Sequence, residues 1–336
     1  MPVSLINNFS FLEMALLSTL IYFDQFDYPL TSIELKKWIY WPGFLSSGTP
    51  LDLLDIETTL QKSAQLSSVI ETSSGFWFLR GRSDLIFTRG KRYREAQKKY
   101  RRLRRVLFWT RAVPFIRAVF VTNTLSYNNT RKESDIDLFM ITAKDKMWSA
   151  RFFMVSFLKL CGIRPRRDGY HQDAVCANFW VAESHLGVAE VAWRNRRGEI
   201  VDVHLAHLFG CMVPVWDDKN MLKKFFAENH WIDTFFGNDY HNRLNSTRRI
   251  RHTVLTRFCQ SLLEKIFFEK GFERKVRQFQ MKVLPVSLQK AALEHDTRVV
   301  VSDTILKFHL NDRRCDVLHE FSRRLNEYEE QLCQEQ

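Results

Sequence analysis

Apolar side chains recur at helical spacing over residues 11–23, and apolar and polar side chains alternate over residues 69–79. Between these segments, a second helix opens with Thr31 and Glu34 at the spacing of a capping box, and a third helix is expected over residues 55–65. The tripeptide Ser73-Ser74-Gly75 interrupts the alternation as a hairpin turn does. Three helices followed by a hairpin predict a winged-helix-like domain over residues 1–88. Such a module serves for DNA binding, for protein contact or as a lid on the next domain.

A strongly basic segment follows, with ten Arg or Lys and one Glu over residues 89–105. One face of this segment, read as a helix, can dock on a core, and it carries Ala96, Tyr100, Leu103, Leu107 and Thr110. We therefore expect a basic linker helix over residues 89–113. The same cationic surface would also steer a nucleic acid or a nucleoside triphosphate toward a neighbouring site.

The middle of the chain combines β-prone and helical segments. The elements expected there are strands over residues 116–121, 135–142 and 174–182 and helices over residues 147–160 and 200–212. Beyond Pro214 the spacing is helical, with many aromatic and basic residues. The pattern thus predicts an α+β fold, with a core of mixed sheet and helices over residues 114–215 and a helical C-terminal region over residues 216–336.

Composition narrows the class of protein. Hydrophobic residues make up 45% and charged residues 26% of the 336 residues, which is the balance of a globular chain. The formal net charge of +12 favours phosphate-bearing partners. The six cysteines form no C-x-x-C pair, so their spacing predicts neither a zinc site nor a disulfide framework. The N-terminus lacks the pattern of a signal peptide, and no apolar stretch approaches the ~20 residues of a membrane span. We expect a cytoplasmic protein.

Two carboxylates stand out as candidate metal ligands. Asp135 and Asp137 are two residues apart at the opening of an apolar strand, so strand geometry places both on one face. There they repel each other unless a cation lies between them. Mg²⁺ suits such a pair, because retained waters and substrate phosphates complete its octahedron of oxygens. An N-cap or a solvated strand edge is the alternative, but the apolar neighbours of Asp137 favour a metal site.

The segment before the two carboxylates is suited to binding phosphate. A strand runs into Thr122-Asn123-Thr124-Leu125, where backbone N–H groups and hydroxyls can face an anion. Together with Ser134-Asp135-Ile136-Asp137-Leu138, this segment resembles the Gly-Ser … Asp-x-Asp signature of the DNA polymerase β-like nucleotidyltransferase superfamily. The spacing between the two parts is also similar.

Other segments resemble an uncharacterised bacterial branch of this superfamily, in which a winged-helix-like segment precedes the nucleotidyltransferase core. These segments are residues 26–31, 75–79, 116–121, 176–182 and 306–309, together with Trp148 and Arg151. The resemblance covers most of the chain. Its Asp-x-Asp segment is the part specific enough to imply chemistry.

The resemblance implies an enzyme that transfers a nucleoside monophosphate from a nucleoside triphosphate to an unidentified acceptor, a nucleic acid or a protein among the possibilities, with release of pyrophosphate. It also implies that the catalytic residues Asp135 and Asp137 hold two Mg²⁺ ions. The residues it assigns to nucleotide binding are Asn123, Thr124, Ser126 and Ser134.

Two departures from the signature support an alternative. Asn123 and Thr124 replace its glycine and serine, although Asn tolerates left-handed backbone and Thr keeps a hydroxyl. Active members also carry a third carboxylate on a later strand. Here the inward position of that strand is Asn178, and Asp202 is the remaining candidate if its segment is not helical. The alternative is a catalytically degenerate nucleotidyltransferase fold that acts as a nucleic-acid or partner-protein binding module.

Overall fold

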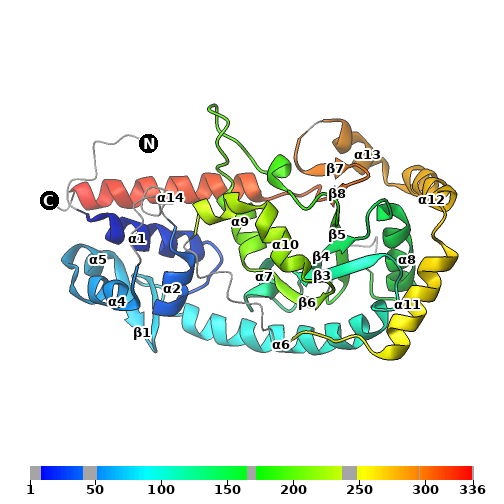
Figure 1. The fold of residues 1–336 in the computed structure, drawn as a ribbon. Coiled ribbons are helices and arrows are strands. Elements are labelled where there is room, and N and C mark those ends of the chain that lie inside the picture. The colour runs from blue at the N-terminus through cyan, green and yellow to red at the C-terminus, as the bar shows by residue number, and fades with distance from the viewer. Residues whose placement is uncertain (1–8, 41–50, 165–171, 237–247, 295, 335–336) are drawn as a thin grey trace.

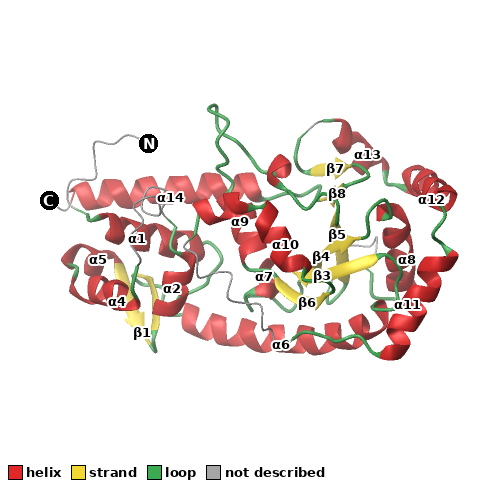
Figure 2. Ribbon diagram, in the orientation of Figure 1, coloured by secondary structure: helices red, strands yellow, loops and turns green. Residues whose placement is uncertain are grey.

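Two long helices run along opposite sides of the molecule and connect an N-terminal lobe to a six-stranded sheet (Figure 1). They are α6 (Leu85–Thr110) and α14 (Arg314–Gln334). The computed structural model describes residues 9–40, 51–164, 172–236, 248–294 and 296–334. Within these residues, helices and strands form the α+β fold that the sequence predicts (Figure 2).

The N-terminal lobe is built around α1 (Phe11–Asp24), whose residues from Met14 onward are buried on every face. A helix that is covered all round has to lie at the centre of a core. The other elements of the lobe are α2 (Ser32–Trp38), α4 (Leu53–Lys62), α5 (Ala64–Val69), β1 (Ile70–Ser73) and β2 (Phe76–Leu79). The segment expected as the third helix therefore contains two short helices.

The predicted capping box and hairpin turn of this lobe are both present in the structure. The Thr31 hydroxyl accepts a hydrogen bond from the Glu34 amide at 3.3 Å, and the Glu34 carboxylate accepts one from the Thr31 amide at 3.0 Å. The hairpin turns at Ser74 and Gly75, with φ of 53° and 79°. Two successive positive φ values give the tight turn whose twist matches the flanking strands. The capping box and the hairpin are thus confirmed.

Helix α6 presents a buried face and a basic face. The five positions expected to dock on a core are all buried, namely Ala96, Tyr100, Leu103, Leu107 and Thr110. Several of its basic side chains form ion pairs with other elements, namely Arg89 with Glu34, Arg92 with Asp27 and Lys99 with Asp173. These ion pairs neutralise part of the positive charge of the helix within the protein. They also connect the N-terminal lobe to the sheet.

The sheet has the strand order β6-β3-β4-β5-β8-β7. Its strands are β3 (Ile116–Val121), β4 (Ile136–Thr142), β5 (Val175–Ala182), β6 (Val213–Asp217), β7 (Val299–Val301) and β8 (Ile305–Phe308). Strands β4 and β5 are parallel, joined through helix α8 (Met147–Leu160), and the other neighbours are antiparallel. The expected mixed sheet and its first three strands are confirmed.

The C-terminal region corrects one expectation, because residues 216–336 are not helical throughout. Strand β6 crosses the expected boundary at residue 215, and β8 and β7 extend the sheet beyond β5. These last strands have 4 and 3 residues, too short for any period to reveal them. The region's other main elements are α10 (Met221–Glu228), α11 (Val254–Ile266), α12 (Lys270–Val283), α13 (Val286–Leu293) and α14.

None of the described helices combines the length and apolar character needed to cross a membrane.

Candidate metal centre

The two carboxylates predicted from the sequence lie together with a thiol. Asp135 and Asp137 stand at the opening of β4, and Cys176 pairs with Asp137 on the parallel strand β5. One ligand atom from each residue lies within 4.8 Å of the other two. Strand period places the carboxylates on one face, and the β4–β5 register adds the sulfur. We refer to Asp135, Asp137 and Cys176 as the acidic centre.

Negative charge is concentrated at the acidic centre. Burial and the neighbouring charge of Asp135 raise the pKa of Asp137 to about 7, against the lowering effect of a hydrogen bond from Asn123. Burial and both carboxylates also raise the pKa of the Cys176 thiol well above its usual range, although the charge of Arg164 opposes this. Within the described residues, neither carboxylate forms an ion pair with Lys, Arg or His. A bound cation would reverse both pKa shifts.

Sequence reasoning did not identify Cys176. It selected Asn178 as the inward residue of this strand, and Cys176 lies two residues earlier, so strand period already placed both on the same face. The structure brings them into contact, since the Asn178 side-chain amide donates to the Cys176 sulfur. The position beside Asp137 that could have carried a third carboxylate thus holds a thiol and an amide.

The turn before the acidic centre opens with Asn123, which has the left-handed φ of 56°. Asparagine adopts this region more readily than most residues, so it reproduces the backbone freedom of the signature glycine. Its side chain does not leave the space empty, because Nδ2 donates to Asp137 Oδ2 at 2.7 Å. Asn123 thus adopts the left-handed backbone that the turn requires, and its side chain holds one of the two carboxylates in place. Short helix α7 (Asn123–Ser126) follows.

The loop that leads into Asp135 is held by a buried lysine. The Lys99 ammonium of α6 donates to the carbonyl oxygens of Lys132 at 3.0 Å and Ser134 at 2.7 Å, and it pairs with Asp173 at 2.7 Å. These bonds satisfy all three of its donors. The segment preceding the first carboxylate is thus fixed by the helix that the sequence marks as a basic linker.

Part of the predicted nucleotide-binding set faces a cavity of about 670 Å³. Asn123, Thr124 and Ser134 line one side of it. Ser126 does not, because it is buried and donates its hydroxyl to the Asn123 carbonyl at 2.6 Å. Ser126 therefore supports the turn from behind, and its expected contact with the triphosphate stays a prediction.

The rest of the cavity wall carries aromatic and basic side chains and also three acidic ones, Asp312, Asp316 and Glu320. Phe26 of the N-terminal lobe stacks on His204 of α9 (Val203–Gly210) with ring centroids 5.6 Å apart. Burial lowers the pKa of His204 to about 4, so this ring is neutral at pH 7. Arg92 and Arg131 also line the cavity. A ligand with both a flat ring and phosphate groups would find complementary surfaces here.

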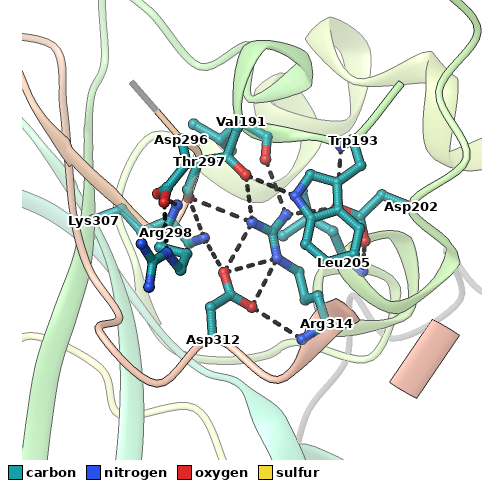
Figure 3. Close-up of polar contacts among 10 residues, drawn as sticks. All are labelled: Val191, Trp193, Asp202, Leu205, Asp296, Thr297, Arg298, Lys307, Asp312 and Arg314. Atoms are coloured by element: carbon teal, nitrogen blue, oxygen red, sulfur yellow. Dashed lines mark hydrogen bonds and ion pairs between the residues drawn. The ribbon is translucent and has the colours of Figure 1, made fainter. Parts of the chain in front are cut away.

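Asp202 has a structural role away from the acidic centre. It caps α9, where its Oδ1 accepts from the Leu205 amide at 2.9 Å, so the segment begins its helix one residue later. Its other oxygen pairs with Arg314 at 2.5 Å, and Arg314 also pairs with Asp312 at 2.9 Å (Figure 3). Lys307 completes this group through Asp312 at 2.7 Å. We refer to Asp202, Lys307, Asp312 and Arg314 as the paired cluster, and its pairing leaves Asp202 unsuited to serve as a third carboxylate.

The donors present can be compared with the two Mg²⁺ ions that the sequence resemblance implies. Asp135 and Asp137 supply the oxygen ligands for one divalent cation. A second Mg²⁺ would need a further bridging carboxylate, and among the described residues the third donor of the group is the Cys176 sulfur. The residues therefore fit one divalent cation and do not fit the expected pair of Mg²⁺ ions.

Comparison with known proteins assigns no family to the chain. No family model, no curated protein and no solved structure matches it. The chemistry of the acidic centre and its cavity is therefore the basis for any functional inference.

Proposed function

We propose that the protein is a nucleotidyltransferase that uses a divalent cation to move a nucleoside monophosphate from a nucleoside triphosphate to an acceptor hydroxyl. The observation that carries the proposal is the acidic centre at the opening of β4, next to the Asn123 turn and its cavity. The proposal includes a winged-helix-like fold for the N-terminal lobe and a nucleotidyltransferase fold for the core.

The proposed roles follow from the contacts. Asp135 and Asp137 hold the cation, which would neutralise charge on the transferred phosphate. Asn123 positions Asp137, and Thr124 and Ser134 offer polar groups from the cavity wall. Arg131 brings an exposed guanidinium to the cavity wall, whereas Arg92 is already paired with Asp27, and the Phe26–His204 pair offers a surface for a nucleobase. These groups together suit a ligand that combines a base with a phosphate chain.

Isothermal titration tests the proposal. ATP, CTP, GTP and UTP are each titrated into the protein with a divalent cation, and at least one is expected to bind with measurable heat. Asp135→Ala should abolish that heat by removing a metal ligand. Glu133→Ala is the matched control, because it removes an exposed carboxylate two residues earlier and should leave binding unchanged. The absence of heat with all four nucleotides, or equal heat with Asp135→Ala and wild type, would refute the proposal.

A second candidate is a binding module without turnover. It is favoured by the Asn123 side chain against Asp137 and by the amide of Asn178 on the neighbouring strand. This candidate predicts salt-sensitive binding of RNA or DNA that persists in Asp137→Ala. A binding constant that does not change with salt concentration would contradict it.

A further inference from the structure

We infer that the acidic centre selects one thiophilic divalent cation of the Zn²⁺ class, held by Asp135, Asp137 and Cys176, in place of a pair of Mg²⁺ ions. The inference deepens the proposed function and rests on it for the role of the ion in transfer. The binding of the ion is tested without nucleotide.

The geometry is close to that of a coordinated ion. Zinc binds sulfur at about 2.3 Å and carboxylate oxygen at about 2.1 Å, so tetrahedral ligands lie about 3.6 Å apart. The three donors lie within 4.8 Å of one another before any ion is present. Rotation of the side chains can close a difference of this size, and the strands that carry them need not move.

The donor chemistry separates the candidate ions. Mg²⁺ demands an octahedron of oxygens and keeps several of its waters, so a sulfur in its shell is unfavourable. Thiolate ligands select zinc and other softer ions, while carboxylates accept both kinds. Since Cys176 is 8% exposed and faces both carboxylates, an ion between the carboxylates would meet the sulfur at once.

A neighbouring residue orients the Cys176 sulfur. The Asn178 side-chain amide donates a hydrogen bond to Cys176 Sγ. Residues behind metal ligands commonly orient them by hydrogen bonds of this kind. Asn123 acts in the same way on Asp137, with its Nδ2 at 2.7 Å from Oδ2. Each amide thus holds one of the three ligands in place.

The site also leaves room for substrate. Asp135 and Asp137 are partly exposed, and Asn123, which donates to Asp137, lines the cavity. Three protein ligands match the donor number of a catalytic zinc site, in which the fourth position is left for water or substrate.

Cobalt provides the direct test, because thiolate ligation of Co²⁺ produces a charge-transfer band in the near ultraviolet. The metal-free full-length protein is titrated with CoCl₂, and we expect this band to saturate at one equivalent. Zn²⁺ should displace the cobalt, and a large excess of Mg²⁺ should not. Cys176→Ser should remove the band and weaken Co²⁺ binding by more than about 10-fold. Cys161→Ser is the matched control, since Cys161 is an exposed thiol and its loss should leave the band intact.

A second measurement does not depend on a variant. X-ray absorption at the zinc edge of the wild-type protein should show one sulfur at about 2.3 Å with oxygen or nitrogen completing the shell. A shell of oxygen and nitrogen alone, cobalt binding without the band, or loss of the band in Cys161→Ser would overturn the inference.

Different results would refute the proposed nucleotidyl transfer and the proposed zinc-class ion. Nucleotide binding with Mg²⁺ and no cobalt band would leave the proposed function standing and remove the zinc-class ion. A cobalt band that depends on Cys176, with no binding of any nucleotide, would keep the ion site and remove nucleotidyl transfer.

Discussion

The acidic centre and the paired cluster both bring two aspartates together, and they treat the resulting charge in opposite ways. In the paired cluster, Asp202 and Asp312 flank the Arg314 guanidinium at 2.5 and 2.9 Å (Figure 3). In the acidic centre, Asp135 and Asp137 have the neutral amide of Asn123 and the thiol of Cys176 as neighbours. One pair of carboxylates is neutralised by the chain itself, and the other is left for a cation.

The pKa values of the carboxyl groups follow from this difference. Burial opposes ionisation of Asp312, but hydrogen bonds and charge from Arg314 and Lys307 outweigh it and hold its pKa well below the usual range. At Asp137, burial and the charge of Asp135 act in the same direction and raise the pKa to about 7. The Asp312 carboxylate thus has its charge balanced by Arg314 and Lys307, whereas no cationic side chain is among the causes that set the pKa of Asp137.

The paired cluster lies where several elements of the fold meet, so its ion pairs can stabilise the fold. Asp202 begins α9, Lys307 belongs to β8, and Arg314 begins α14, so the cluster joins three elements that are distant in sequence. Helix α14 then reaches the N-terminal lobe, where Arg324 pairs with Asp24 of α1 at 2.7 Å. The cluster holds one end of the helix that spans lobe and sheet.

The largest effect is expected from Arg314→Met, which removes the cation of the paired cluster. Asp202 is fully buried, so its charge would be left without its partner, and breaking a buried pair in this way costs about 3–5 kcal/mol. Urea denaturation followed by circular dichroism measures the loss. Arg313→Met is the matched control, because Arg313 is exposed and should change stability by less than about 0.5 kcal/mol. Equal losses in the two variants would show that the pairing does not stabilise the fold.

Asp137→Asn is expected to raise the free energy of unfolding, by less than Arg314→Met lowers it. The substitution removes one charge from the acidic centre and keeps an oxygen that can accept the hydrogen bond from Asn123. Between about pH 4 and pH 7 the unfolded chain has ionised Asp137 while the folded protein retains its proton, so wild-type stability falls as pH rises through this window. The variant lacks this loss and should exceed wild type by at least about 1 kcal/mol at pH 8 without metal.

Thermal unfolding at pH 4, 6 and 8 measures the effect of Asp137→Asn. The variant's advantage should grow across the series, and a saturating divalent cation should remove it by stabilising wild type alone. A constant difference at all three pH values would contradict the raised pKa of Asp137.

The smallest effect on stability is expected from Asn123→Gly, which removes the amide that the chain provides to Asp137. Loss of the hydrogen bond costs about 1 kcal/mol, and glycine relieves the left-handed backbone, so the net change should be within about 1 kcal/mol. The space gained beside the turn should strengthen nucleotide binding in titration calorimetry. Asn128→Gly is the control, because it makes the same backbone change at φ 64° and lies outside the acidic centre. Equal tightening in the two variants would show that the gain does not come from space beside the acidic centre.

Much of the fold could be predicted because its signals are local. The Thr31 capping box, the Ser74-Gly75 turn, the buried face of α6 and the bounds of β3 and α8 all follow from residues a few positions apart. The shared face of Asp135 and Asp137 belongs to this group, because a separation of two residues on a strand decides it.

The features that the sequence did not predict depend on contacts between distant segments of the chain. Strand β8 lies beside β5 although more than a hundred residues separate them in the chain, and its 4 residues carry no periodic signal. Cys176 joins Asp137 through the register of two parallel strands, and Asp202 meets Arg314 across 112 positions. Such partners depend on strand register and helix packing, which a local pattern cannot specify. Local spacing therefore established that two acids share a face, and packing of distant segments decided that a sulfur stands beside one acidic pair and an arginine beside the other.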